Sequence, residues 1–127
     1  MNPDLINTTT LAFLGDAVYE VYVRKHVMES GEHRADKLHR MAVRYVRADA
    51  QASIIKYIFD DLTESEQKLV KRARNHKSAT KPKNVSPVTY KWATSHEALI
   101  GYLYIADDLD RLEEILLKSV NFIDKME

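Results

Sequence analysis

The chain contains no cysteine, and glycine and proline are almost as scarce, with three of each among 127 residues. The missing cysteines exclude disulfide bonds and any metal site built from thiolates. Scarce glycine and proline, together with abundant Leu, Ala, Lys, Glu and Arg, favour helix and argue against disorder. Because a chain of this length can bury one hydrophobic core, we expect a single compact all-α domain spanning residues 1–127.

Long apolar runs are absent as well. The sequence has no stretch of 18 apolar residues that could cross a membrane. Its start also lacks the basic segment followed by an apolar stretch that marks a secretory signal. These absences predict a soluble, cytoplasmic protein with no membrane partner.

The net charge is zero, but the charges are unevenly placed along the chain. Between Lys68 and His96 there are eight lysines and arginines and no acid, so all 19 Asp and Glu residues lie elsewhere. Such a segment is either a solvated surface or a surface that binds phosphates. Eight cations without an acid favour salt-dependent contacts with nucleic acid that do not read the bases.

Apolar periodicity and capping residues predict about six helices. The expected ranges are about 9–28, 35–45, 48–59, 64–76, 87–105 and 108–126. Thr63 and Glu66 fit a capping box, and Ser86 before Pro87 fits a cap followed by proline in the first turn. Gly31 suits the left-handed residue after a helix end. The basic stretch 77–85 lacks periodicity and is predicted to be a loop.

The first predicted helix carries Asp16 inside the apolar run LAFLGDAVYEVYV. A carboxylate taken out of water costs several kcal/mol unless it is paired, so Asp16 needs a partner or an exposed position. Helical spacing puts Val18 and Val21 on one side, and Asp16, Glu20 and Val23 on the other. The two acids therefore either face solvent or lie on a second face that another chain covers.

Glu97 is the second isolated acid, standing ahead of nine uncharged residues in the predicted fifth helix. Two carboxylates that met without a cation would repel each other. Mg²⁺ prefers oxygen ligands and is commonly held by one or two carboxylates together with a substrate phosphate. The residue types therefore indicate a Mg²⁺ site at Asp16 and Glu97, with ordinary surface acids as the alternative.

Two motifs carry a resemblance to a known family. The stretch LAFLGDAV around Asp16 resembles the signature helix of the ribonuclease III family, and EALIG at Glu97 resembles its second catalytic helix. DKLH, RARNHKS, PKN and YKWATSHEALIGYLY bring the likeness closer to the Mini-ribonuclease III subfamily, which consists of the nuclease domain without a double-stranded-RNA-binding domain. The resemblance covers nearly the whole chain. It implies a Mg²⁺-dependent endoribonuclease that hydrolyses double-stranded RNA, with Asp16 and Glu97 as catalytic and metal-binding residues.

The family pattern is not kept in full. Larger ribonuclease III proteins have a glutamate four residues before the signature aspartate and an aspartate three residues before the second glutamate, where this chain has Ala12 and Thr94. Because Mini-ribonuclease III proteins resemble this chain in that respect, we interpret the change as a subfamily trait. Glu20, one helical turn after Asp16, is then a candidate substitute metal ligand, directly or through water.

The resemblance also implies partners. They are a second copy of the chain in a symmetric homodimer, and double-stranded RNA, in particular the precursor of 23S ribosomal RNA. The basic segment would bind A-form RNA by its shape and backbone. The candidate RNA contacts are Arg72, Arg74, Asn75, His76, Lys77, Ser78, Lys81 and Lys83. Two alternatives stay open, which are a non-catalytic helical module that binds structured RNA and a helical interaction protein without a nucleic-acid role.

Overall fold

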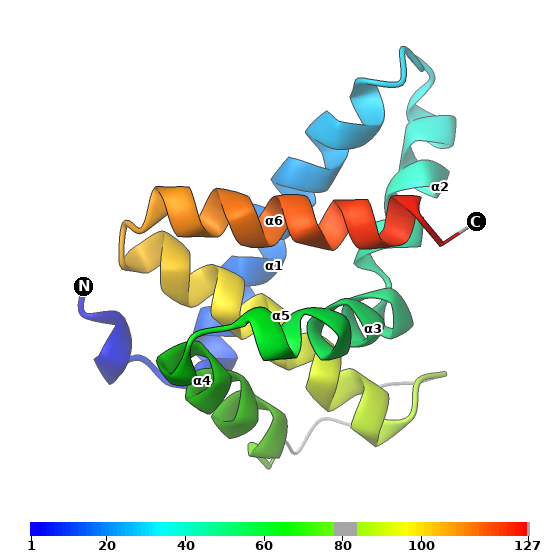
Figure 1. Cartoon of the computed structure of the whole chain (residues 1–127). Helices are drawn as coiled ribbons and strands as arrows, with labels where there is room; N and C mark the ends of the chain where they lie inside the picture. The colour runs from blue at the N-terminus through cyan, green and yellow to red at the C-terminus, as the bar shows by residue number, and fades with distance from the viewer. Residues whose placement is uncertain (78–83, 127) are drawn as a thin grey trace.

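The computed structural model describes residues 1–77 and 84–126, and within these ranges it contains six α-helices and no strand (Figure 1). The helices are α1 (Thr8–Met28), α2 (Ala35–Val46), α3 (Ala48–Ile58), α4 (Glu64–Asn75), α5 (Pro87–Ile105) and α6 (Leu109–Asp124). Short 3-10 turns, η1 (Pro3–Leu5) and η2 (Phe59–Asp61), precede α1 and follow α3. The predicted all-α fold is confirmed. No helix in the described ranges combines the length and apolarity needed to span a membrane.

Local sequence signals determine where several helices begin and end. The Thr63 side chain accepts a hydrogen bond from the backbone of Glu66 at 3.1 Å, and the Glu66 carboxylate accepts one from the backbone of Thr63 at 2.9 Å. The Ser86 hydroxyl oxygen accepts from the backbone of Thr89 at 3.1 Å. Gly31 has a φ of 91°, in the left-handed region that favours glycine. The predicted capping box, cap and helix stop are therefore confirmed.

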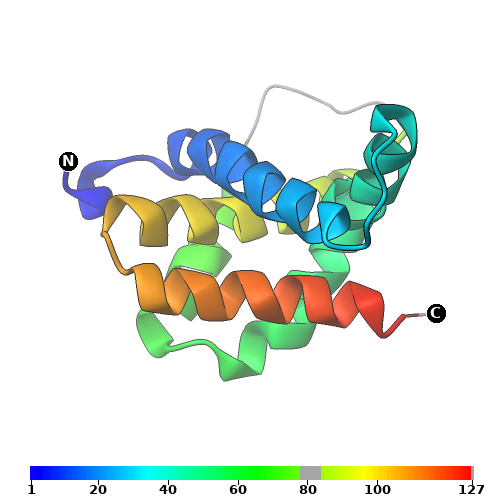
Figure 2. The same ribbon diagram turned by 90° about the horizontal axis from the view of Figure 1, so that it is seen from above.

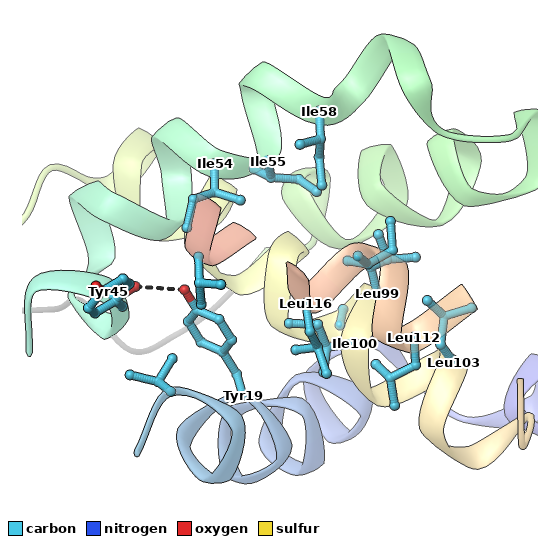
Figure 3. Packing of buried hydrophobic residues seen from close by; sticks show 14 of the residues in the cluster. Tyr19, Tyr45, Ile54, Ile55, Ile58, Leu99, Ile100, Leu103, Leu112 and Leu116 are labelled. Atoms are coloured by element: carbon cyan, nitrogen blue, oxygen red, sulfur yellow. Dashed lines mark hydrogen bonds between the residues drawn. The ribbon is translucent and has the colours of Figure 1, made fainter. Parts of the chain in front are cut away.

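Helix α5 lies at the centre of the fold, in contact with α1, α3, α4 and α6, and Figure 2 shows α1 lying across it. The buried core draws residues from all six helices, and Figure 3 shows the part where α3, α5 and α6 meet. Its labelled aliphatic residues are Ile54, Ile55, Ile58, Leu99, Ile100, Leu103, Leu112 and Leu116. Burying each such side chain stabilises the fold by roughly 2 kcal/mol. These residues thus fix α5, which carries Glu97, against α3 and α6.

The buried face of α1 differs from the face that helical spacing predicted. Helical spacing puts Val21 on the side opposite Asp16 and Glu20, the side that an amphipathic helix buries. Val21 is instead 70% exposed, whereas Tyr19 and Val23 are fully buried. The reason is that apolar residues surround α1 almost completely, so periodicity cannot select a face. The small residues Ala12 and Gly15 select it, because they are buried where α5 approaches closely.

Candidate functional site

Two glycines allow α1 and α5 to pack with their backbones in direct contact. A β-carbon at Gly15 would lie 1.7 Å from the backbone oxygen of Glu97, and one at Gly101 would lie 1.9 Å from the backbone oxygen of Leu11. Only glycine fits where two backbones approach this closely. Because Asp16 directly follows Gly15, this crossing brings Asp16 next to Glu97, although the two acids lie far apart in the sequence.

The carboxyl groups of Asp16 and Glu97 interact with each other. Burial and, next, the negative charge of Asp16 raise the pKa of Glu97 to about 8. No positively charged group of the described residues contributes to this shift. Asp16 itself is exposed, so the pair is open to solvent on one side. Two acids held together without a cation form a site that a divalent metal ion would stabilise.

Glu20 does not join this pair in the structure. Its carboxylate forms an ion pair with Arg24 at 3.2 Å, one helical turn further along α1. Within residues 1–77 and 84–126, no group of three or more His, Asp or Glu side chains could hold a metal ion together. The structure thus brings together Asp16 and Glu97 of the predicted ligands and pairs Glu20 elsewhere. The role of Glu20 as a ligand through water stays a prediction.

Sequence reasoning missed the polar side chains that support Glu97 from the interior. The side-chain nitrogen of Gln51 on α3 lies 3.3 Å from a carboxylate oxygen of Glu97. Gln51 also contacts the buried ring of His96, which in turn contacts Ser119 on α6. Burial lowers the pKa of His96 to about 3, so the ring is neutral. Sequence spacing cannot show that residues on three different helices lie together. The only sequence signal for this cluster is that His96 directly precedes Glu97.

The described part of the basic segment forms a surface around Trp92. Arg74 stacks over the indole ring at 4.8 Å, and Lys56 of α3 approaches it at 5.5 Å. Beside it lies an open cavity of about 420 Å³, lined by Arg74, Asn75, Lys77, Val88, Lys91 and Trp92. Of the predicted RNA contacts, Arg72, Asn75, His76 and Lys77 are exposed and Arg74 is half-buried. Ser78, Lys81 and Lys83 lie outside the described residues. Lys56 and Trp92 were not predicted as part of this surface.

The carboxyl pair should make the stability of the metal-free protein depend on pH. The pKa of Glu97 is about 8 in the folded chain against an ordinary 4.5, so between these values the folded state binds more protons than the unfolded state. The free energy of unfolding should therefore decrease as pH rises through this window, by roughly 3–5 kcal/mol, and level off above it. Urea unfolding in EDTA from pH 5 to pH 9 measures this decrease. The Glu97→Gln variant should lack that component, and identical profiles for the two proteins would contradict the pairing.

This chain is similar in sequence and in fold to known proteins. A family model described as the ribonuclease III domain matches residues 9–108, a range that includes both acids. The Mini-ribonuclease 3 of Symbiobacterium thermophilum is 46% identical over 124 residues, which cover 98% of this chain and 95% of that protein. The Mini-ribonuclease 3 of Streptococcus pneumoniae is 45% identical over 89% of this chain and 90% of its own. A crystal structure of a protein from Fusobacterium nucleatum matches with a TM-score of 0.82 at 32% identity, covering 92% of this chain and 93% of that one.

Proposed function

The chain belongs to the ribonuclease III family, and on that premise we propose that it is a Mg²⁺-dependent endoribonuclease that hydrolyses double-stranded RNA. The family membership expected from the two motifs is confirmed by the family model and by the relatives. One structural observation carries the proposal. Asp16 and Glu97, the acids of those two motifs, meet where α1 crosses α5.

Mg²⁺ fits the chemistry of this site. Asp16 and Glu97 offer carboxylate oxygens, the ligands that this ion prefers, and their mutual repulsion is what a divalent cation relieves. When bound, the ion supplies a more acidic water and offsets negative charge at the phosphate. The contribution of the protein is to hold both carboxylates in one place. Their separation is fixed because Gly15 and Gly101 lock α1 against α5.

The surface around Trp92 is the proposed binding surface for the RNA backbone. Arg74 and Lys77 supply cations to this surface and Asn75 adds a polar group, while Arg72 and His76 are exposed on the same segment as further candidate contacts. Contacts of this kind neutralise phosphates and make the affinity fall with salt. Since the grooves of A-form RNA are recognised mainly by shape and backbone, little sequence preference is expected from them. Ser78, Lys81 and Lys83 remain predicted contacts.

The active form proposed here is a symmetric homodimer formed through α1. Phe13, one turn before Asp16, is 82% exposed, and Val21 is 70% exposed on the same helix. Large exposed apolar side chains on one element favour an isologous contact with a second copy. Such a dimer would carry two carboxyl pairs, one for each RNA strand. From the family resemblance we also propose the precursor of 23S ribosomal RNA as the substrate and the cytoplasm as the location.

A cleavage assay with the purified chain tests the proposed function. In Mg²⁺ the chain should cut a long RNA duplex and leave each separated strand intact, and EDTA should stop cleavage completely. Denaturing gels report cleavage, and retention on a duplex-RNA column at low salt reports binding. An intact duplex that is still bound would favour the non-catalytic RNA-binding module. The sequence argument for that alternative is that Ala12 and Thr94 replace two acids of the family. Failure to bind would favour a helical interaction protein.

A further inference from the structure

A buried chain of polar side chains ends at the carboxylate of Glu97. Ser119 of α6, His96 of α5 and Gln51 of α3 contact one another in that order, with heavy-atom distances of 3.0 Å and 2.7 Å. The side-chain nitrogen of Gln51 then lies 3.3 Å from the Oε2 atom of Glu97. Gln51 is 2% exposed, and His96 and Ser119 are fully buried. A fully paired polar chain inside a core holds its members in one arrangement.

The hydrogen-bond partners fix the orientation of the Gln51 amide. Its nitrogen donates to the backbone oxygen of Val46 at 2.8 Å and faces the carboxylate of Glu97. A flipped amide would place its oxygen against these two acceptors, which would leave them unpaired and repelled. The nitrogen therefore donates to both. The oxygen of Gln51 consequently accepts a hydrogen bond from the Nδ1 atom of His96.

The same reasoning fixes the tautomer of His96. Its Nδ1 atom carries the proton, and in the neutral ring the Nε2 atom lies 3.0 Å from the hydroxyl oxygen of Ser119, which also donates to the backbone oxygen of Ile115 at 2.7 Å. The ring also packs edge-on against Tyr19, with ring centroids 4.9 Å apart. Tyr19 is itself held by its hydroxyl, which donates to the backbone oxygen of Tyr45 at 3.0 Å (Figure 3). The interior thus holds Gln51 in place from the side opposite Glu97.

An amide is well suited to support a carboxylate that must also bind a cation. A lysine or arginine at this position would pair with Glu97 as an ion and compete with the metal. The neutral amide of Gln51 donates one hydrogen bond to a carboxylate oxygen and does not neutralise the negative charge of Glu97. Groups that orient a metal ligand in this way commonly change metal affinity or activity by about 10- to 100-fold when removed.

We propose that Gln51 is a positioning residue for the cleavage reaction, which holds the carboxylate of Glu97 beside Asp16 and is itself held by His96 and Ser119. This inference builds on the proposed nuclease function. It assigns a role to three buried polar residues for which the hydrophobic core has no use, and it predicts that the metal site depends on α3 and α6 as well as on α1 and α5.

The test replaces Gln51 by methionine, which has nearly the same shape and no hydrogen-bond donor. Gln67→Met is the matched control, because the side chain of Gln67 likewise donates to a backbone oxygen, that of Phe59, at 2.9 Å. Gln51→Met should lower kcat about 10- to 100-fold with an unchanged KM for duplex RNA, and should weaken Mn²⁺ binding, measured by electron paramagnetic resonance without RNA, by a similar factor. Gln67→Met should change neither quantity. Equal Mn²⁺ affinities and equal kcat values for the two variants would overturn the positioning role.

A second measurement does not depend on cleavage. Nitrogen-15 spectra of the histidine rings in the metal-free wild-type protein should show His96 protonated at Nδ1, and Gln51→Met should alter this signal. Protonation at Nε2 in the wild type would overturn the assigned orientation. If Gln51→Met fails to fold, Ser119→Ala replaces it, and a loss in kcat without a change in KM is again expected. If the wild type cleaves no RNA, the proposed function fails, whereas Mn²⁺ affinity and ring signals still decide the role of Gln51.

Discussion

The Asp16→Asn variant is expected to cleave duplex RNA about a thousandfold more slowly than the wild-type chain, or not measurably, while remaining folded. Asparagine keeps the shape of the side chain but removes its charge, so only one carboxylate of the pair remains to hold Mg²⁺. Folding should be unaffected because Asp16 is exposed. Loss of its charge also removes one cause of the raised pKa of Glu97. Single-turnover cleavage of a labelled duplex and thermal unfolding measure the two effects.

Two further variants separate loss of chemistry from loss of binding. Asp110→Asn, at an exposed acid in the first turn of α6, is the matched control and should cleave like the wild type. The combined replacement of Arg72, Arg74 and Lys77 by alanine should produce the opposite pattern to Asp16→Asn, with weaker binding and a smaller salt dependence. Turnover of Asp16→Asn close to that of the wild type would remove Asp16 from the site.

Gly101→Ala should destabilise the fold by about 3 kcal/mol or more, which is a large share of the net stability of a small domain. Its β-carbon would lie 1.9 Å from the backbone oxygen of Leu11, and a helix backbone cannot turn aside as a flexible side chain can. Gly15→Ala should act similarly, since its β-carbon would meet the backbone of Glu97 at 1.7 Å. Urea unfolding monitored by circular dichroism measures the loss.

The third glycine provides the comparison for this prediction. No atom lies within 4 Å of a β-carbon at Gly31, so alanine there meets only the strain of a φ of 91°. Gly31→Ala should therefore cost about 1 kcal/mol. If Gly101→Ala were as stable as Gly31→Ala, α1 and α5 would have to lie further apart than described, and the contact between Asp16 and Glu97 would lose its structural basis.

Helix positions followed from the sequence because their signals are local. Thr63 and Glu66 form their capping box within one turn, and Ser86 and Gly31 act on the residues next to them. The two acids also stood out without a structure, because a charge inside an apolar run is conspicuous wherever the chain folds. Family resemblance then connected the two motifs, and the comparisons confirm that family.

Which face of each helix is buried could not be predicted in the same way. Spacing assigned Val21 to the core side, but α1 is apolar on almost every side, and its orientation was decided by the small residues Ala12 and Gly15 that allow α5 to approach. Glu20 has the spacing of a metal ligand, yet its carboxylate pairs with Arg24. A single helix considered alone does not reveal which of its faces a distant helix will cover.

By itself, the sequence determined that the chain is helical, where its helices begin and end, and which two acids and which basic segment are candidates for chemistry. Tertiary structure alone decided how Asp16 meets Glu97 at a crossing of two glycines, that Gln51 and His96 support Glu97 from within, and that Lys56 joins Arg74 at Trp92. The physical reason is the distance along the chain over which each kind of interaction acts. Caps and periodicity act within a turn or two of one helix, whereas each of these contacts joins different helices and exists only once close packing has brought their backbones together.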